Sequence, residues 1–288
     1  YDDDEVAWSY ADGSGNLYAG EFKTINGRRF AFRNDGRCVF GLKFILEEDD
    51  ALDVRADDDD TMPFEDEDEF DENAPLYEAL GYKCYYFGET GDAPTDGSMR
   101  TGRTTVDLGG DSFTFYFETS GGDKGAGVTG EEDDRYYQSG KLLAAGSDER
   151  YQVVERYVAN PDDPEDEQVY AYRVLDDVDE FFDRVRDRFG NEAVWKVPLS
   201  NYDENQDMGD IFGISNMNQD ASDLDELYVF YDKADAEVNE NVALDTDDFF
   251  LVNTSGRVVD GRGRSRDGND YYFVTDSQGR ITAVYLED

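Results

Sequence analysis

Short runs of aromatic residues followed by glycine-rich polar segments recur along this chain. The two clearest copies are residues 8–20 and 30–41, each containing two glycines five residues apart. The glycines of the second copy lie 21 residues after those of the first (36−15 and 41−20). Repetition at a fixed spacing is typical of proteins built from stacked identical units. Further copies begin at Tyr85, Phe115, Tyr136, Phe249 and Tyr271.

Each copy predicts a β-hairpin. An aromatic run favours a strand, and Asn, Asp, Ser and Gly supply the backbone conformations that a tight turn requires. A single hairpin cannot bury its rings, so neighbouring hairpins must stack. The pattern therefore predicts a mainly β protein in the form of a hairpin-repeat solenoid.

Between residues 156 and 246 the repeat is lost and a helical pattern replaces it. Residues 176–190 carry acidic side chains at the start, arginines near the end and Gly190 just beyond, as helix ends prefer. Strands are expected at 169–174, 193–199 and 227–231 to cover the apolar face of this helix. We interpret the segment as a small α/β insert, or α+β domain, that interrupts the solenoid. The apolar face is formed by Val178, Phe181, Phe182, Val185 and Phe189.

A strongly acidic stretch separates the first two groups of repeats. Residues 47–72 include the runs 47–50, 57–60 and 65–69, in which every side chain is acidic. Like charges repel and extend a chain, so we expect either a solvated connector or an irregular insertion. The predicted organisation is N-terminal hairpins at 1–46, an acidic connector at 47–80, central hairpins at 81–155, the insert at 156–246 and C-terminal hairpins at 247–288.

The composition excludes several classes of protein. The chain has 71 acidic and 26 basic side chains, a net charge of −45, no histidine and two cysteines. Such a charge repels nucleic acids, so no nucleic-acid partner is expected. The absence of histidine removes the commonest general base, and two cysteines are too few for an all-cysteine zinc site. No apolar run is long enough to span a membrane. We therefore expect a protein without catalytic activity.

The repeats resemble those of the cell-wall-binding family, the choline- and glucan-binding repeats of Gram-positive, clostridia-like surface proteins. Residues 22–41 are similar to a complete family unit, residues 85–146 to three units, and residues 249–279 to two more. The resemblance implies a hairpin-repeat fold and an extracellular location at the cell wall or cell surface. It also implies a cell-wall polymer or glycan as the partner.

In that family, an aromatic cage formed by adjacent hairpins holds choline through cation–π contacts. In this chain the residues after the closing glycines are Leu42, Arg103, Glu131, Ser147 and Arg262, none of them aromatic. Two alternatives remain: the rings form the core of the solenoid, or some form a platform for a sugar or for choline. The candidate ligand-binding residues are Trp8, Phe22, Tyr85, Tyr86, Tyr136, Tyr137, Tyr271 and Tyr272.

One loop is a candidate calcium site, and calcium is the one cofactor that the sequence suggests. Asp203, Asn205 and Asp207 place oxygen ligands at alternate positions, as calcium loops do. The loop departs from the EF-hand pattern, with Met208 at the glycine position and Ile214 in place of the final glutamate. A polar loop without a metal is the alternative.

The two cysteines, Cys38 and Cys84, are either both buried thiols or one disulfide across the acidic connector.

Three functions remain open from the sequence. The first is a secreted or surface-attached module that binds cell-wall polymer or glycan. The second is a self-assembling extracellular scaffold or filament, in which the C-terminal strand at 281–286 of one copy meets the next. The third is an acidic glycosidase, for which no segment places a pair of carboxylates in a recognisable setting.

Overall fold

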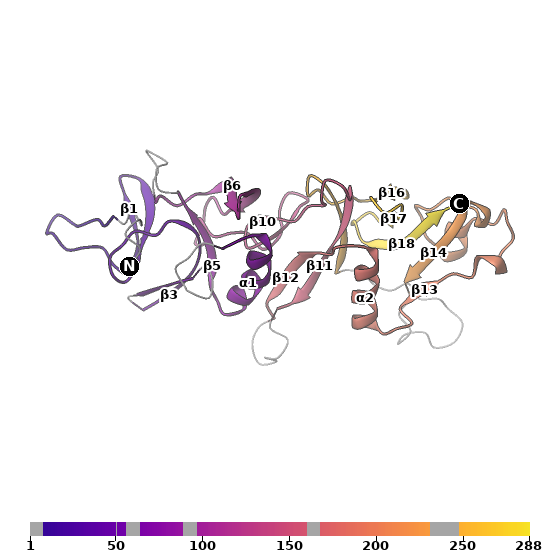
Figure 1. The fold of residues 1–288 in the computed structure, drawn as a ribbon, viewed down its shortest axis with the longest axis horizontal. Coiled ribbons are helices and arrows are strands. Elements are labelled where there is room, and N and C mark those ends of the chain that lie inside the picture. Colours follow the sequence, from indigo (N-terminus) through magenta and orange to yellow (C-terminus); the bar gives the residue numbers. More distant parts are fainter. Residues whose placement is uncertain (1–7, 50, 56–63, 89–96, 160–167, 231–247) are drawn as a thin grey trace. The chain divides into compact units, whose positions relative to one another are not determined.

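The structure, a computed structural model, describes residues 8–49, 51–55, 64–88, 97–159, 168–230 and 248–288. Its chain divides into two compact units. The first unit contains residues 1–130, 137–142 and 158–171, and the second contains residues 131–136, 143–157 and 172–288. Both are built mainly of antiparallel strands, which confirms the predicted mainly β class (Figure 1).

The same five-residue turn closes hairpins in both units. In residues 33–37, the N–H of Arg33 donates to the carbonyl of Arg37 and the N–H of Gly36 donates to the carbonyl of Arg33, both at 2.8 Å. The same two hydrogen bonds close residues 12–16, 253–257 and 276–280. Gly36 has a φ of 84°, a left-handed conformation that glycine adopts without steric cost. Four of the seven copies therefore contain the turn that the sequence predicts, whereas the described residues of the copies that begin at Tyr85, Phe115 and Tyr136 do not show this pair of hydrogen bonds.

The first unit contains a two-stranded hairpin, β1-β2, and two larger sheets in the orders β4-β3-β5 and β6-β7-β10-β9-β8; Glu131 and Tyr136, at the ends of two strands of the last sheet, are counted in the second unit. All of the strand pairs with a described register are antiparallel. The elements are β1 (Glu21–Ile25), β2 (Arg28–Phe32), β3 (Gly41–Glu48), β4 (Ala51–Arg55), α1 (Glu67–Ala79), β5 (Lys83–Phe87), β6 (Gly102–Leu108), β7 (Asp111–Phe117), β8 (Gly130–Glu131), β9 (Tyr136–Gln138) and β10 (Lys141–Leu142).

Helix α1 covers the aromatic core of the first unit and lies beside β5 in Figure 1. The helix begins after Asp66, whose side chain accepts a hydrogen bond from the N–H of Glu69. Phe70 and Tyr77 point inward, and the Phe70 ring lies 6.0 Å from that of Phe44 on β3. The stretch that we expected to be an acidic connector thus contains a packed helix, because Phe70 and Tyr77 recur on one face between its carboxylates. The acidic run 57–60 lies outside the described residues.

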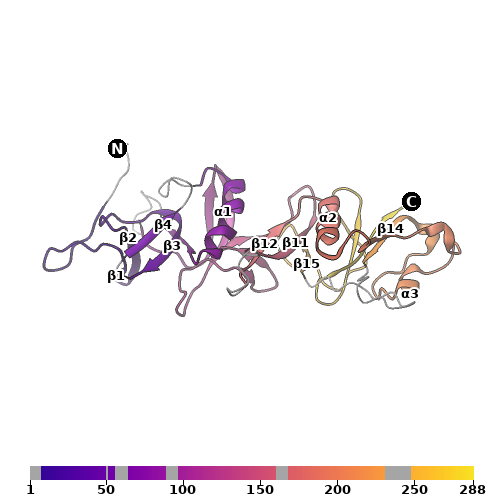
Figure 2. The same cartoon turned by 90° about the horizontal axis from the view of Figure 1, so that it is seen from below.

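The second unit contains two sheets, in the orders β12-β11-β15 (Figure 2) and β13-β14-β18-β17-β16. Two short 3-10 turns, Leu199–Asn201 and Ala221–Asp223, precede and follow α3. The elements are β11 (Tyr151–Val158), β12 (Tyr170–Val174), α2 (Val178–Phe189), β13 (Val194–Lys196), α3 (Met208–Phe212), β14 (Leu224–Phe230), β15 (Phe249–Asn253), β16 (Ser265–Arg266), β17 (Tyr272–Thr275) and β18 (Ile281–Glu287).

Helix α2 confirms the helix predicted at 176–190. It is capped by Asp177, whose side chain accepts from the N–H of Glu180, and it ends at Gly190 with a φ of 97°. Four of the five residues of its predicted apolar face are buried and Phe189 is half-buried, with the Phe181 ring 5.3 Å from the rings of both Phe230 and Phe249.

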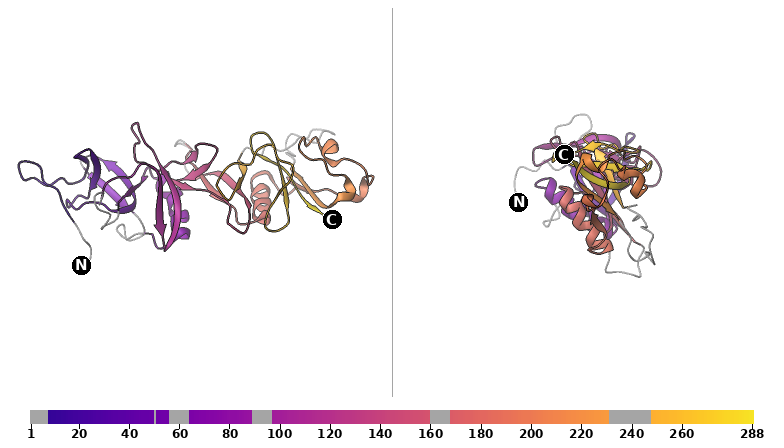
Figure 3. Two further views of the ribbon diagram at one scale, coloured as in Figure 1. Left: turned by 90° about the horizontal axis from the view of Figure 1, so that it is seen from above. Right: turned by 90° about the vertical axis from the view of Figure 1, so that its right-hand side faces the viewer.

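The strands of the expected insert pair with strands of the expected C-terminal repeats. Strand β14 pairs with β18, and Leu227 lies opposite Tyr285. Strand β18, the yellow strand that leads to the C-terminus in Figure 3, has β17 on its other side, and it is therefore central in its sheet. The expected strand at 193–199 contains β13, and residues 227–230 of the other expected strand form the second half of β14, whereas Tyr231 lies outside the described residues. A buried sheet such as this one takes its strands from distant segments, which local sequence patterns do not show.

Candidate functional site

The candidate rings of the first unit lie in or against its aromatic cores. Trp8 is half-buried, and its ring lies 5.4 Å from the Phe30 ring. Phe22 is half-buried too, 5.2 Å from the buried ring of Tyr85. Tyr86 and Tyr137 are buried, the first near Phe117 and the second near Tyr116.

The candidate rings of the second unit differ in their accessibility. Tyr271 and Tyr272 are half-buried, and the Tyr272 ring stacks on Tyr285 at 5.1 Å with the guanidinium of Arg264 over it. Tyr136 is 5% exposed, yet it lines a cavity. The eight candidate residues therefore do not form one site, and Tyr136 is the one that borders the cavity of the second unit.

This cavity has a volume of about 470 Å³ and an aromatic wall. The Tyr136 ring lies 4.7 Å from Phe250 and 5.4 Å from Tyr172, with which it stacks. Phe250 and Tyr172 are half-buried. Tyr136, Tyr172 and Phe250 pack in one hydrophobic cluster with Val154 of β11, the strand between β12 and β15. The full lining is Glu131, Tyr136, Arg156, Tyr172, Phe250, Gln278 and Arg280.

The polar rim of the cavity is held in place by hydrogen bonds. Arg156 Nε donates to Asp248 Oδ1 at 2.6 Å, and Arg280 Nε donates to Asp276 Oδ2 at 2.6 Å. A carboxylate bound to one edge of a guanidinium fixes the plane of the group. Gln278 is exposed at the rim.

The hydroxyl of Tyr136 stays protonated in this setting. Burial raises the pKa of Tyr136 well above its usual value, and the negative charge of Glu131 raises it further. A neutral phenol can both donate and accept a hydrogen bond. The cavity thus combines an apolar wall with donors and acceptors of fixed orientation.

Sequence reasoning identified Tyr136 but missed the other members of this site. Tyr172 and Phe250 stand in strands that the sequence predicts, so alternation could have assigned them to one face of each strand. Nothing in the sequence places those two faces beside Tyr136. Arg156 and Arg280 could not have been selected from the 26 basic residues.

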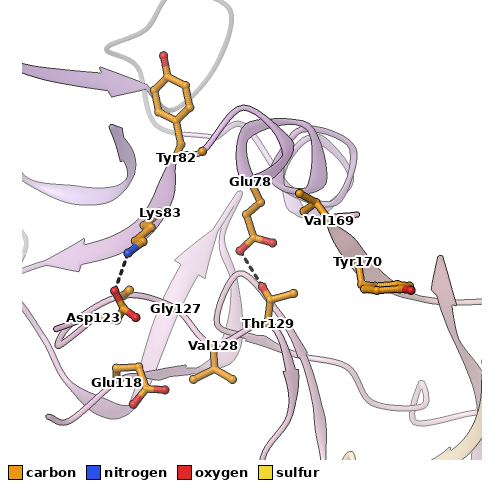
Figure 4. A pocket seen from close by; sticks show the side chains of 12 residues that line it. Glu78, Tyr82, Lys83, Glu118, Asp123, Gly127, Val128, Thr129, Val169 and Tyr170 are labelled. Atoms are coloured by element: carbon orange, nitrogen blue, oxygen red, sulfur yellow. Dashed lines mark hydrogen bonds and ion pairs between the residues drawn. The ribbon is translucent and has the colours of Figure 1, made fainter. Parts of the chain in front are cut away.

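A second cavity, of about 460 Å³, lies in the first unit (Figure 4). It is lined by Glu78, Tyr82, Lys83 and Asp123, among others, and by Tyr170, whose side chain is 42% exposed. Lys83 Nζ donates to Asp123 Oδ1 at 2.5 Å. Three carboxylates, of Glu78, Glu118 and Asp123, line the cavity together with this one lysine.

Glu78 is the central carboxyl of that cavity, and a hydrogen-bond network holds it. Thr129 Oγ1 donates to Glu78 Oε1 at 2.7 Å, and Gln138 Nε2 donates to Glu78 Oε2 at 2.8 Å. Burial raises the pKa of Glu78, against the lowering effect of these donors. Because the carboxyl is already held by its neighbours, the network ties α1 to β9 and contributes chiefly to the structure.

The predicted calcium residues lie in a loop before α3. The side chain of Asp207 caps this helix by accepting from the N–H of Asp210 at 3.0 Å. Asp203 and Asn205 line a shallow hollow together with Tyr202, Glu204 and Gln206. Within the part of the chain that the structure describes, no three His, Cys, Asp or Glu side chains are grouped as a metal would require. A calcium site here stays a prediction.

Cys38 and Cys84 are free and buried. Of the two alternatives, a disulfide or two buried thiols, the structure therefore contains the two thiols. Burial raises the pKa of Cys38 to about 12, and burial also raises the pKa of Cys84. A thiol that stays protonated is a poor nucleophile, so neither cysteine is suited to catalysis.

Comparisons with known proteins find only weak matches. No family model and no curated protein sequence matches the chain. Among solved structures, CbpJ from Streptococcus pneumoniae TIGR4 is 20% identical over 49% of this chain, with a TM-score of 0.17. CbpF in complex with ipratropium is 18% identical over 48% of this chain, with a TM-score of 0.15. An alternansucrase in complex with isomaltononaose is 13% identical over 95% of this chain, with a TM-score of 0.17.

The chain spans less than half the length of each of these structures: 41% of CbpJ, 42% of CbpF and 17% of the alternansucrase. Among the described residues, no helix is long and apolar enough to cross a membrane.

Proposed function

We propose that this chain is a non-catalytic, secreted or cell-surface protein of the hairpin-repeat type, which binds a cell-wall polymer or glycan in the cavity around Tyr136. The observation that carries the proposal is the combination of an aromatic wall with a fixed polar rim in one cavity of suitable size. Pockets for small molecules are mostly apolar, with a few polar groups that fix the orientation of the ligand.

A saccharide has the matching chemistry. Its C–H faces are apolar and pack on aromatic rings, while its hydroxyl groups require donors and acceptors around the edge. Tyr136, Tyr172 and Phe250 supply the rings. The guanidinium groups of Arg156 and Arg280 donate, the carboxylate of Glu131 accepts, and Gln278 does both.

The repeated turns support the hairpin-repeat part of the proposal. Four turns have identical hydrogen bonds, at 12–16, 33–37, 253–257 and 276–280, and the last three lie in or at the end of segments that resemble cell-wall-binding repeats. Stacking of such hairpins into a solenoid is part of this proposal, as is the extracellular location.

Choline is not the expected ligand, because the positions that complete a choline cage carry Leu42, Arg103, Glu131, Ser147 and Arg262. A choline titration is therefore the negative control for binding experiments.

The test measures binding of purified Gram-positive cell-wall glycan and of defined oligosaccharides by calorimetry. Tyr136→Phe removes the hydroxyl and keeps the ring stack, and Gln278→Ala removes an exposed amide at the rim. We expect each variant to weaken binding several-fold and the pair to weaken it further. Tyr10→Phe, which removes the hydroxyl of a tyrosine that is 40% exposed in the other unit, is the matched control and should bind like the unaltered protein.

Absence of saturable binding by the unaltered protein to any of these glycans contradicts the proposal. Binding that is unchanged in Tyr136→Phe and Gln278→Ala places the glycan site elsewhere.

A further inference from the structure

Strand β6 lies at the edge of the sheet β6-β7-β10-β9-β8, so that only one side of it is paired. It pairs with β7 over its whole length, from Gly102 opposite Phe117 to Leu108 opposite Asp111, without a register shift. A seven-residue edge strand without a bulge or a proline is open to pairing with another chain.

The backbone groups that point outward follow from the hairpin. Leu108 and Asp111 flank the two-residue turn Gly109-Gly110, and residues in that position exchange hydrogen bonds. Bonded and non-bonded pairs alternate along an antiparallel ladder, so the N–H and C=O groups of Arg103, Thr105 and Asp107 face away from β7. None of these backbone groups bonds to another described residue.

The side chains of the same three residues are exposed. The inward side chains of β6, Val106 and Leu108, are buried in the core that α1 covers. Across the described part of the chain, no carboxylate forms an ion pair with Arg103. The carboxylate of Asp107 accepts a hydrogen bond from the N–H of Gly110 at 3.0 Å and remains at the surface.

The order of the exposed side chains along β6, a positive, a neutral and a negative one, makes this sheet edge complementary in charge to the same edge of a second copy. If two β6 strands run antiparallel with Thr105 opposite Thr105, then Arg103 of each copy lies opposite Asp107 of the other. The residues with outward backbone groups are then opposite one another, as hydrogen-bonded pairs require. Cross-strand pairs of opposite charge stabilise a sheet, and like charges in the same position destabilise it.

We propose that β6 is a homodimer interface, through which a second copy of this chain extends the sheet. The contact forms about six main-chain hydrogen bonds and two Arg103–Asp107 ion pairs. Because both copies use the same surface, the contact closes at two copies and does not propagate as a filament.

Overall charge opposes this association, since each copy carries a net charge of −45. Screening weakens long-range repulsion more than it weakens a contact between adjacent strands, because the Debye length falls from about 8 Å at 0.15 M salt to about 3 Å at 1 M. We therefore expect the dimer to become more abundant as NaCl is raised over this range.

The experiment is sedimentation velocity of the full chain over a concentration series at both salt concentrations. Arg103→Asp and Asp107→Arg each place two pairs of like charges opposite one another and should each raise the dimer dissociation constant about tenfold or more. The double variant Arg103→Asp/Asp107→Arg reverses both charges, recreates the opposite pairs and should restore dimerisation.

Two further variants separate the contact from general effects. Asp111→Arg changes the net charge by the same amount as Asp107→Arg, on the paired strand β7, and should dimerise like the unaltered protein. Thr105→Pro removes an N–H that faces away from β7. The β6-β7 hairpin should therefore still fold, because it does not use this N–H, whereas dimerisation should be lost. Circular dichroism of every variant verifies folding.

A chain that stays monomeric at all concentrations and salts overturns the proposal. So does a dimer that the single charge reversals leave intact, or one that the double variant fails to restore. These outcomes leave the glycan proposal unaffected, because none of the altered residues lines the cavity around Tyr136.

Discussion

The ammonium of Lys141 donates hydrogen bonds to both carboxylate oxygens of Asp71, at 2.8 and 2.7 Å. Lys141 lies on β10 and is 3% exposed, whereas Asp71 lies at the surface on α1. Glu67, one turn earlier on the helix, also pairs with the ammonium. A buried ammonium is costly unless it is paired, so this contact fixes α1 on the sheet that contains β10.

We expect Asp71→Ala to lower the free energy of unfolding by about 1–3 kcal/mol, because Lys141 then loses one of its two carboxylates in a buried position. Asp68→Ala is the matched control, since Asp68 is an exposed acidic residue on the same helix. Its effect should stay within about 0.5 kcal/mol. Urea unfolding followed by circular dichroism measures both. Equal effects of the two substitutions contradict a special role for the Lys141–Asp71 pair.

The second prediction concerns the pH dependence of stability at Asp267. This residue is 6% exposed, and burial raises its pKa to about 6, against two backbone N–H groups that lower it. Between pH values of about 4 and 6 the folded chain retains a proton on Asp267 that the unfolded chain has lost. The contribution of this group to the free energy of unfolding therefore falls as the pH rises through that window.

Asp267→Asn should consequently be more stable than the unaltered protein near neutral pH, by about 1–3 kcal/mol, and the difference should shrink as the pH is lowered toward about 4. An asparagine oxygen can accept the same two hydrogen bonds, as Asn253 does in a related turn. Thermal unfolding across a pH series measures the effect. A difference in stability that does not change with pH contradicts this assignment.

Asp12 provides a contrast of opposite sign. It is exposed, and backbone hydrogen bonds from Asn16 and Ser14 lower its pKa. The Asp12 carboxylate stabilises the folded chain at pH values above the pKa that Asp12 has in the unfolded chain. This contribution is lost as the pH falls through the lower pKa that Asp12 has in the folded chain. Asp12→Asn should therefore show no gain in stability at neutral pH.

The third prediction concerns Gly263, which lies where two backbone segments approach closely. A Cβ atom at this position would lie 1.7 Å from the carbonyl oxygen of Asn216, so one of the two segments must move. We expect Gly263→Ala to destabilise the protein by at least about 1–3 kcal/mol. Gly13→Ala is the control, because nothing lies within 4 Å of its added carbon, and it should be neutral or slightly stabilising. If both variants melt at the same temperature, the close approach at Gly263 is contradicted.

The fourth prediction follows from the charge of the chain. With 71 acidic side chains, mutual repulsion in the compact state should decrease as salt screens it. We expect the melting temperature to rise with NaCl and with CaCl2. A melting temperature that rises with neither salt contradicts this expectation, whereas a rise with calcium alone favours the predicted site at Asp203, Asn205 and Asp207.

Local features of the fold were predictable from the sequence because local hydrogen bonds create them. The turn at 33–37 is closed within five residues, and in the turn at 253–257 the Asn253 side chain accepts from the N–H groups of Ser255 and Arg257. Helix α2 shows its cap, its apolar face and its terminating glycine within one segment. These elements require no knowledge of the rest of the chain.

Helix α1 shows where such reasoning fails. Its residues include seven acidic or amide side chains among Phe70, Ala74 and Tyr77, so the charge suggested a solvated connector. Burial of Phe70 against Phe44 and Phe115 stabilises the helix in spite of that charge. Most of the stability of a helix in a protein comes from packing of one face, which depends on distant residues.

The sequence by itself determined the turns, the strand type, the helix α2, the negative charge and the candidate Tyr136. The tertiary structure decided which strands are neighbours, so that β18 lies between β14 and β17 and β6 lies at an edge. It also decided that Tyr136 meets Tyr172 and Phe250, whose positions in the sequence are far from its own. The physical reason is that hydrogen-bonded turns and caps depend on adjacent residues, whereas cavities and sheet edges arise only when distant segments pack together.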